Sequence, residues 1–259
     1  MSFMKSIAVA AAVLAAPIAA HAESILQEVL NTGVLKVGTT GDWNPMTMKD
    51  VATDSYTGYD IDVMTQLAAD LGVEVEFVPA DWRTLVSGIS AGTYHMTGSA
   101  SVTPARAKVA GYSQPYFSLG TVPLVNAKDA ERFKDWDDLN AAGVKVAATL
   151  GTTQEQQVKS FFPDAEHIIV DAPARDFQEV LAGRADAHIT SNVEAMQLVK
   201  RYPQLMIVPV SEPRARALVA MLLPQDDQVW INYVNTWIAA KTEAGFFDEL
   251  AVKWGVPLE

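Results

Sequence analysis

The sequence predicts an α/β protein of two lobes, each a mostly parallel sheet flanked by helices. Three observations predict this class. Strand-like and helix-like segments alternate through the first third of the chain, the alternation restarts near residue 144, and extended segments near 118–122 and 216–219 join the two units. A chain that crosses twice between two such units forms a clam shell. We expect the first lobe at residues 23–118 plus 223–259 and the second at 119–222.

Elements of the first half are indicated by turn residues and by hydrophobic period. Gly33 closes a short helix, apolar residues at helical spacing mark residues 61–71, and residues 73–78 alternate as a strand does. The expected elements are helix 26–32, strand 34–39, a turn at 41–45, helix 61–71, strand 73–78, helix 82–89 and strand 94–97.

The second half repeats the alternation and ends in helices. Aromatic residues at 230, 233 and 237 lie on nearby faces of one long helix. The expected elements are strand 144–148, a helix ending at 161, strand 167–170, helix 177–181, strand 187–190, helix 193–201, strands 205–210 and 217–223, and helices 228–242 and 247–254. No short repeat or low-complexity run interrupts them.

The first 22 residues have the pattern of an export signal. Lys5 supplies a positive charge, residues 7–20 are apolar but too short to span a bilayer, and Ala20-His21-Ala22 has the small-x-small form of a cleavage site. No cysteine follows for a lipid anchor. We expect a free periplasmic protein that begins at Glu23; the alternative is a retained N-terminal anchor.

Composition restricts the partners. The chain has 19 basic and 31 acidic residues, a net charge of −12, and no cysteine. This argues against nucleic acid or an anionic membrane as partner, although a local arginine pocket can still hold an anion. Thiol catalysis and thiolate metal sites are excluded. Histidines and carboxylates do not show metal-ligand spacing either, so we expect no metal and no cofactor.

Loops that follow parallel strands meet at one edge, where such sheets bind ligands. Five loops meet this description: 39–43, 80–82, 98–106, 151–154 and 190–194. The third offers neutral donors around Gly98, Ser99 and Ser101 and the planar guanidinium of Arg106, a combination suited to a carboxylate. Thr103-Pro104 predicts a helix start whose positive dipole end favours an anion. The alternative is an ordinary loop with Arg106 on a solvated face.

Five short motifs, in this order and spacing, resemble the polar amino-acid family of bacterial solute-binding proteins, which has the type 2 periplasmic binding fold. They are Leu35-Lys-Val-Gly-Thr39, Gly58-Tyr-Asp-Ile-Asp62, Ser101-Val-Thr-Pro-Ala-Arg106, Tyr112-Ser-Gln-Pro-Tyr116 and Leu150-Gly-Thr-Thr-Gln154. The resemblance covers residues 25–255. It implies that Arg106 clamps a ligand carboxylate, that Ser101, Thr153 and Gln154 add donors, and that Trp43 covers the ligand.

Position 191 departs from that family. Amino-acid binders usually carry an aspartate there for the ligand's ammonium, whereas this chain has Ser191, with Glu194 about one helical turn further on. An enzymatic subgroup, the cyclohexadienyl dehydratases, is similar at residues 39–43 and 81–82 and at Glu194, which matches their general acid. An acid whose pKa is raised by an apolar cleft can protonate a departing hydroxyl. Residues 218–224 lack the lysine of the dehydratase stretch.

Several of these side chains allow a second interpretation. Glu194 is also interpretable as a solvated helix residue or as a contact for a cation, which two tryptophans and a carboxylate would suit. Trp43 and Trp82 follow strand ends, so we expect cleft lining rather than core. Asp42 caps its turn or contacts ligand, and we favour the cap. We expect His95 and His188 to be packed or hydrogen-bonded rather than catalytic.

The sequence therefore predicts a monomeric receptor that closes around a small carboxylate, amino acid or zwitterion and presents it to a membrane ABC permease. A cyclohexadienyl dehydratase with Glu194 as general acid is the alternative. A structural or adhesion protein would have no use for a convergent cleft. The residues expected at the ligand are Asp42, Trp43, Trp82, Gly98, Ser99, Ser101, Arg106, Thr153, Gln154, Ser191 and Glu194.

Overall fold

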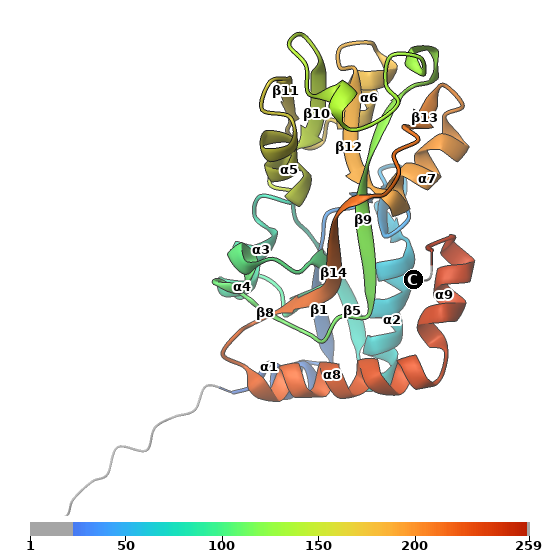
Figure 1. Ribbon diagram of the computed structural model, residues 1–259. Helices are drawn as coiled ribbons and strands as arrows, with labels where there is room; N and C mark the ends of the chain where they lie inside the picture. Colours follow the sequence, from blue (N-terminus) through green and yellow to red (C-terminus); the bar gives the residue numbers. More distant parts are fainter. Residues whose placement is uncertain (1–22, 258–259) are drawn as a thin grey trace, which may run out of the picture.

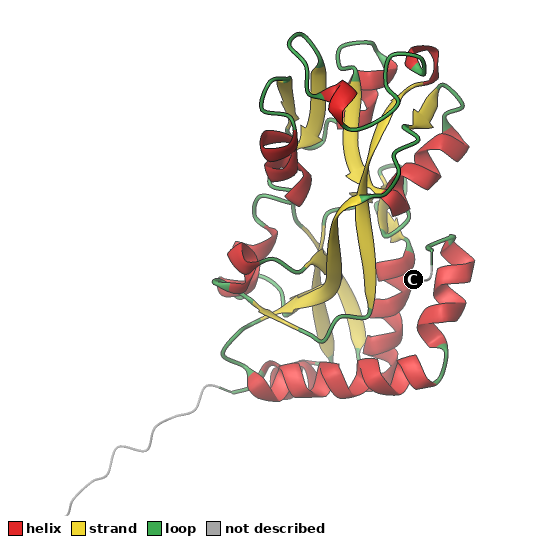
Figure 2. Cartoon of the chain, in the orientation of Figure 1, coloured by secondary structure: helices red, strands yellow, loops and turns green. Residues whose placement is uncertain are grey.

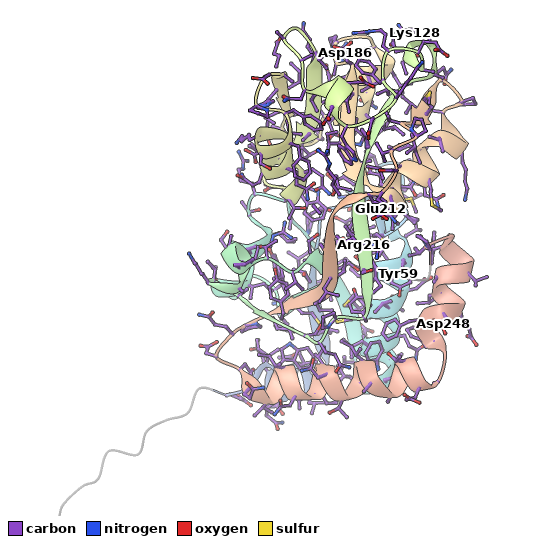
Figure 3. The ribbon with its side chains drawn as sticks, viewed as in Figure 1. Tyr59, Lys128, Asp186, Glu212, Arg216 and Asp248 are labelled. Atoms are coloured by element: carbon purple, nitrogen blue, oxygen red, sulfur yellow. The ribbon has the colours of Figure 1, made fainter. Side chains whose placement is uncertain are left out.

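Two α/β bodies stand end to end in the computed structural model, which describes residues 23–257 (Figure 1). The expected export signal at 1–22 lies outside the described residues. We call the body that contains strand β1 the first lobe and the body that contains strand β10 the second lobe. In Figure 3, Lys128 and Asp186 mark the far end of the second lobe, and Glu212 and Arg216 lie where the chain crosses between the lobes.

A parallel three-stranded sheet in the order β5-β1-β6 forms the centre of the first lobe. A small antiparallel sheet, β2-β3-β4, follows β1 and leads into helix α2. The elements are α1 (Ile25–Thr32), β1 (Val34–Thr39), β2 (Asp42–Trp43), β3 (Thr47–Asp50), β4 (Ser55–Thr57), α2 (Tyr59–Leu71), β5 (Glu74–Pro79), α3 (Leu85–Ser90), β6 (Met96–Thr97), β7 (Ser99–Ser101), α4 (Pro104–Ala107), β8 (Gly111–Tyr112), α8 (Gln228–Glu243) and α9 (Phe246–Trp254).

Parallel strands in the order β11-β10-β12 form the centre of the second lobe, with helices on both sides (Figure 2). The elements are two short 3-10 turns (Ala127–Asp129 and Asp137–Leu139), β10 (Lys145–Thr149), α5 (Thr153–Phe161), β11 (Glu166–Val170), α6 (Asp176–Leu181), β12 (Ala187–Ser191), α7 (Asn192–Arg201) and β13 (Leu205–Ile207).

The two lobes share an antiparallel pair of long strands, β9 (Phe117–Asn126) and β14 (Arg214–Leu223). Strand β9 also pairs antiparallel with β12, and β14 with β7 and β8. Each lobe thus has the parallel centre that the alternation predicts, and the antiparallel pairs come mainly from the two crossing segments.

Burial along the crossing strands shows where the chain changes lobes. Leu119 and Val219 pack in the hydrophobic core of the first lobe, whereas Val122 and Leu124 pack in the second. Because Val219 and Met221 already belong to the first-lobe core, we propose that the chain returns near Ala217, before the expected boundary at residue 222.

Two of the elements whose bounds differ from the expected ones do so where the chain is closely packed. Helix α2 begins at Tyr59 rather than 61, since Gly58 adopts φ 140° and a Cβ there would lie 2.3 Å from the Met46 carbonyl oxygen. The strand expected at 94–97 is reduced to Met96–Thr97, because the Tyr94 hydroxyl donates to the Leu85 carbonyl at 2.6 Å and its ring fills the space beside Gly88.

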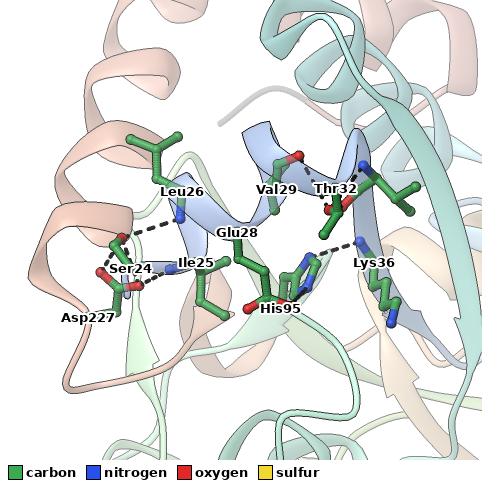
Figure 4. A network of polar contacts seen from close by, with 10 residues as sticks. Ser24, Ile25, Leu26, Glu28, Val29, Thr32, Lys36, His95 and Asp227 are labelled. Atoms are coloured by element: carbon green, nitrogen blue, oxygen red, sulfur yellow. Dashed lines mark hydrogen bonds and ion pairs between the residues drawn. The ribbon is translucent and has the colours of Figure 1, made fainter. Parts of the chain in front are cut away.

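One carboxylate, Asp227, caps two helices, and Figure 4 shows its contacts with Ser24 and Ile25 at the start of the first of them. Its Oδ2 accepts from the Ile25 backbone N–H at 2.6 Å, at the start of α1, and its Oδ1 accepts from the Trp230 N–H at 2.9 Å, in the first turn of α8. The Ser24 hydroxyl also donates to this carboxylate at 2.8 Å. Asp227 therefore ties the first described helix to the C-terminal part of the first lobe.

We predict that Asp227→Ala lowers the free energy of unfolding by about 1–3 kcal/mol, because both helices lose a side-chain acceptor for an N-terminal N–H. Chemical denaturation measures this decrease. Asp226→Ala is the matched control at the exposed neighbouring residue. Equal stability of the two variants would contradict the double cap.

Candidate functional site

A cavity of about 560 Å³, including space open to solvent, lies between the lobes. Both lobes contribute side chains to its wall, mainly from segments at the carboxyl ends of strands, as the topology of α/β sheets leads one to expect. The lining residues are Asp42, Trp43, Trp82, Ser101, Arg106, Leu119, Thr149, Thr152, Thr153, Gln154, Arg175, Asp176, His188, Ile189, Thr190, Ser191 and Glu194.

Arg106 enters the cavity from the first lobe. Thr103 begins helix α4 as expected, with its hydroxyl accepting from the Arg106 N–H at 3.2 Å and proline at the first helical position. Arg106 Nη1 donates to the Ser101 carbonyl at 3.3 Å. Burial lowers the pKa of Arg106, but a guanidinium remains charged at physiological pH. Among residues 23–257 no carboxylate forms an ion pair with it, so an anion in the cavity would meet an uncompensated positive charge.

The helix-dipole contribution expected at Thr103 is weaker than the sequence suggests. Helix α4 has only four residues, and a single turn carries little dipole. Arg106 and hydrogen-bond donors therefore supply most of the attraction for an anion in the first lobe. The second lobe adds the start of the nine-residue helix α5, where Thr153 and Gln154 line the cavity.

Two tryptophans line the cavity, but Trp43 also belongs to the buried core of the first lobe, so the expected choice of lining rather than core does not hold for it. The rings of Trp43 and Trp82 meet edge to face with centroids 5.8 Å apart. Trp82 Nε1 donates to Asp42 Oδ1 at 2.9 Å, so the indole, rather than a backbone N–H of the turn, occupies this carboxylate. The cap that we favoured for Asp42 is therefore wrong. Burial raises the pKa of Asp42, and the Arg175 charge opposes that shift.

Contacts across the cavity hold the lobes together in this structure. Trp43 Nε1, from the first lobe, donates to Ser191 Oγ, from the second, at 3.3 Å. At the rim, Arg83 Nη1 lies 3.5 Å from Asp171 Oδ2. Gly151 lies against the backbone of Arg83, where a Cβ would come within 2.6 Å of its nitrogen. The lobes are therefore in direct contact around the cavity.

Gly98 and Ser99, expected at the ligand, do not line this cavity; the structure places them at a smaller one of about 330 Å³ behind the tryptophans. Ser99 donates from its N–H and hydroxyl to Asp60, at 3.0 and 2.5 Å, and its hydroxyl lies 2.6 Å from the Tyr116 hydroxyl. A Cβ at Gly98 would approach Asp60 Oδ2 to 2.7 Å. These two residues thus anchor strand β7 to helix α2 and position Ser101, which does line the cavity.

A cluster of four ionisable side chains forms the second-lobe wall: Arg175, Asp176, His188 and Glu194. Arg175 Nη2 donates to Glu194 Oε1 at 2.8 Å, and the Thr190 hydroxyl donates to Glu194 Oε2 at 2.6 Å. His188 Nδ1 lies 3.2 Å from Asp176 Oδ2. Three elements bring the cluster together: the start of α6, strand β12 and the first turn of α7.

Burial and charge act against each other in this cluster. Burial raises the pKa of Glu194 although the Arg175 charge lowers it. Burial alone would lower the pKa of His188, but the Asp176 carboxylate more than offsets it and the pKa is raised. The pKa of Asp176 is lowered, because His188 and Arg175 outweigh the effect of burial. Glu194 therefore tends toward the neutral acid while Asp176 and His188 tend toward their charged forms.

Arg175 and Asp176 were missed in the sequence, although a signal was available. They end the loop after strand β11, at the same sheet edge as the loops that were considered. His188 was expected to be packed or hydrogen-bonded, and it is buried but also lines the cavity. His95 is buried and accepts from the Lys36 N–H at 3.1 Å.

The described residues hold no group of three or more histidine or carboxylate side chains arranged to bind a metal ion. In the same part of the chain, every helix is too short or too polar to cross a membrane.

Comparison with known proteins gives consistent results. The sequence model of the bacterial extracellular solute-binding proteins, family 3, matches residues 35–257. The cyclohexadienyl dehydratase of Pseudomonas aeruginosa is 28% identical over 90% of this chain and 86% of its own length. A probable amino-acid ABC transporter-binding protein of Haemophilus influenzae is 25% identical over 90% of this chain and 89% of its own. The crystal structure of the ancestral amino acid-binding protein AncCDT-1, described as a precursor of cyclohexadienyl dehydratase, is 36% identical with a TM-score of 0.83 and covers 89% of this chain and 99% of its own.

We predict that Asp60→Asn flattens the pH dependence of stability. Burial raises the pKa of Asp60 to about 7, whereas an unfolded aspartate titrates near 4. The folded protein therefore holds a proton that the unfolded chain releases, and this contribution to stability is lost as the pH rises from about 4 to about 7. For wild type the free energy of unfolding should fall by roughly 4 kcal/mol over this range, and for the Asn variant this decrease should be absent.

Chemical denaturation at pH 4, 5, 6 and 7 measures the difference between wild type and variant, with Glu74→Gln, at an exposed residue, as control. Parallel pH profiles for wild type and Asp60→Asn would show that Asp60 is already ionised in the folded protein.

Proposed function

The chain belongs to family 3 of the bacterial extracellular solute-binding proteins, and we propose that it closes its lobes around a small carboxylate held by Arg106. One observation carries this proposal: a half-buried guanidinium, without a carboxylate partner among residues 23–257, faces a cavity between two lobes. A charge that is partly removed from water is stabilised by a counter-ion, and a planar carboxylate fits a guanidinium through two hydrogen bonds.

Ligand contacts from both lobes would couple binding to closure. Arg106 and Ser101 come from the first lobe, and Thr153 and Gln154 from the second. A ligand shifts a hinge equilibrium only if it interacts differently with the open and closed states, and contacts to both lobes meet this condition. Gly98 and Ser99, which the sequence predicted at the ligand, are not among the proposed ligand contacts.

We further propose that the protein acts in the periplasm as a monomer, after loss of residues 1–22 and without a lipid anchor. It would present its ligand to a membrane permease of an ABC transporter. The relative from Haemophilus influenzae, named a probable amino-acid ABC transporter-binding protein, supports this role.

We predict that Arg106→Ala weakens ligand binding by about 100-fold, because the buried carboxylate loses a charged, bidentate partner. The ligand for this test is the best stabiliser in a thermal-shift screen of carboxylates, amino acids, betaines and prephenate. Isothermal titration calorimetry then measures the dissociation constant. Lys108→Ala, at an exposed cation just after the same helix, is the control. An unchanged dissociation constant in Arg106→Ala would end this assignment.

A second candidate function is favoured by Glu194. This carboxyl is 7% exposed, lines the same cavity as Arg106, and has a pKa raised by burial. A carboxylic acid whose pKa is raised is a better proton donor to a departing hydroxyl group at higher pH. In a cyclohexadienyl dehydratase that step accompanies loss of CO₂ and forms an aromatic ring, with Arg106 holding the substrate carboxylate. The relative from Pseudomonas aeruginosa carries this name.

For this candidate we predict turnover of prephenate to phenylpyruvate, followed by absorbance, and a loss of at least about 100-fold in kcat for Glu194→Gln. The glutamine keeps the size of the side chain but holds no transferable proton. Failure of the wild-type protein to turn over prephenate would contradict the dehydratase function and leave the receptor function as the proposal.

A further inference from the structure

The second-lobe wall contains buried donors that have no hydrogen-bond partner. Arg175 Nε and both ring nitrogens of His188 are buried without such a partner among residues 23–257. The contact of His188 Nδ1 with Asp176 is close, at 3.2 Å, but lies outside hydrogen-bond geometry. The His188 side chain is only 2% exposed, so water in bulk does not satisfy it. Buried donors are rarely left unpaired, and these two side chains both line the cavity.

The carboxylates of the same wall are already engaged. Both oxygens of Glu194 accept hydrogen bonds, from Arg175 and from Thr190. Asp176 Oδ1 accepts from the Phe177 N–H at 3.0 Å, and its Oδ2 faces His188. A ligand ammonium group would therefore have to displace the present partners of these carboxylates. A hydrogen-bond acceptor on the ligand would instead pair with the donors of Arg175 and His188 that have no partner.

The charges of the cluster favour an acceptor that is an anion. Arg175 is always charged, and Asp176 favours the imidazolium form of His188, in which both ring nitrogens carry protons. Burial raises the pKa of Glu194, and its ion pair with Arg175 opposes that shift. The donors that lack a partner belong to the two positive side chains of the wall, Arg175 and His188, and a charged donor binds an anionic acceptor more strongly than a neutral one.

We propose that Arg175 and His188 form a second subsite, which binds an anionic group of the ligand from the second lobe. Arg106 binds the first carboxylate from the first lobe, so the ligand is a diacid. This inference rests on the proposed binding function of the cavity, and it adds the class of ligand: a compound with two acidic groups, one held by each lobe.

The test compares diacids with monoacids of the same chain length. The probes are the straight-chain dicarboxylates from malonate to adipate, the matched monocarboxylates from propionate to hexanoate, and the amino acids aspartate and glutamate. Calorimetry with the full protein measures each affinity. We expect at least one dicarboxylate to bind tenfold or more tightly than its monocarboxylate partner and than either amino acid.

Variants then assign the gain to the subsite. Arg175→Met and His188→Phe should each remove most of the preference for the diacid while leaving monocarboxylate affinity within about threefold. Arg184→Ala, at an arginine of the same lobe whose side chain is 63% exposed, should change neither. Because Arg175→Met alone leaves Glu194 buried without its partner, the double variant Arg175→Met/Glu194→Gln removes both charges and keeps the test valid if the single variant is unstable.

Each contrary outcome has a distinct meaning. If Arg175→Met weakens monoacids and diacids equally, both arginines share one carboxylate and the second subsite is wrong. If monoacids bind through Arg106 but no diacid gains tenfold, the inference fails and the proposed function stands. If no carboxylate binds in a manner that depends on Arg106, the proposed function fails and the inference fails with it.

Discussion

The unpaired guanidinium of Arg106 is the constraint on which the rest of the site depends. A partly buried positive charge is stabilised by an anion that approaches it, and the cavity that Arg106 lines has its opposite wall in the other lobe. In the proposed function, the group that neutralises Arg106 also lies against the second lobe, so ligand affinity is coupled to lobe closure. The same arrangement serves a receptor, which releases the anion unchanged, and an enzyme, which alters it first.

The position of Arg106 is fixed by contacts among segments far apart in the sequence. Asp60 on α2 accepts two hydrogen bonds from Ser99, and Ser99 contacts the Tyr116 hydroxyl just before strand β9. Strand β7 is thereby held between a helix and the crossing strands, and Ser101 at its end accepts from Arg106. A polar network that is largely buried has little freedom to rearrange, because each lost hydrogen bond leaves an unsatisfied group. The end of the first lobe that carries Arg106 is therefore preorganised.

The sequence predicted those features that depend on local pattern and on the rule that loops after parallel strands meet. Trp43, Trp82, Arg106 and Glu194 line one cavity because each follows a strand end, and the helices and central strands lie within a few residues of their expected positions. Pairing between distant segments was not predictable in this way. Ser99 and Gly98 have the composition of an anion loop, but their partner Asp60 becomes visible only when α2 packs beside β7. Asp42 likewise lies in a sequence typical of a turn cap, but its carboxylate accepts a hydrogen bond from the indole of Trp82.

Ser191 makes structural contacts in the second lobe. Relatives that bind amino acids are expected to use a carboxylate there, whereas the Ser191 hydroxyl accepts from the Glu194 N–H at 3.2 Å and from Trp43 Nε1 at 3.3 Å. Both contacts are structural: the first caps helix α7 and the second joins the lobes. A side chain used for the cap and for lobe contact contributes no charge to the ligand. The charge in this wall comes instead from Arg175, Asp176, His188 and Glu194, whose unsatisfied atoms are all donors. In the proposed second subsite, these donors favour an anionic group of the ligand over an ammonium group.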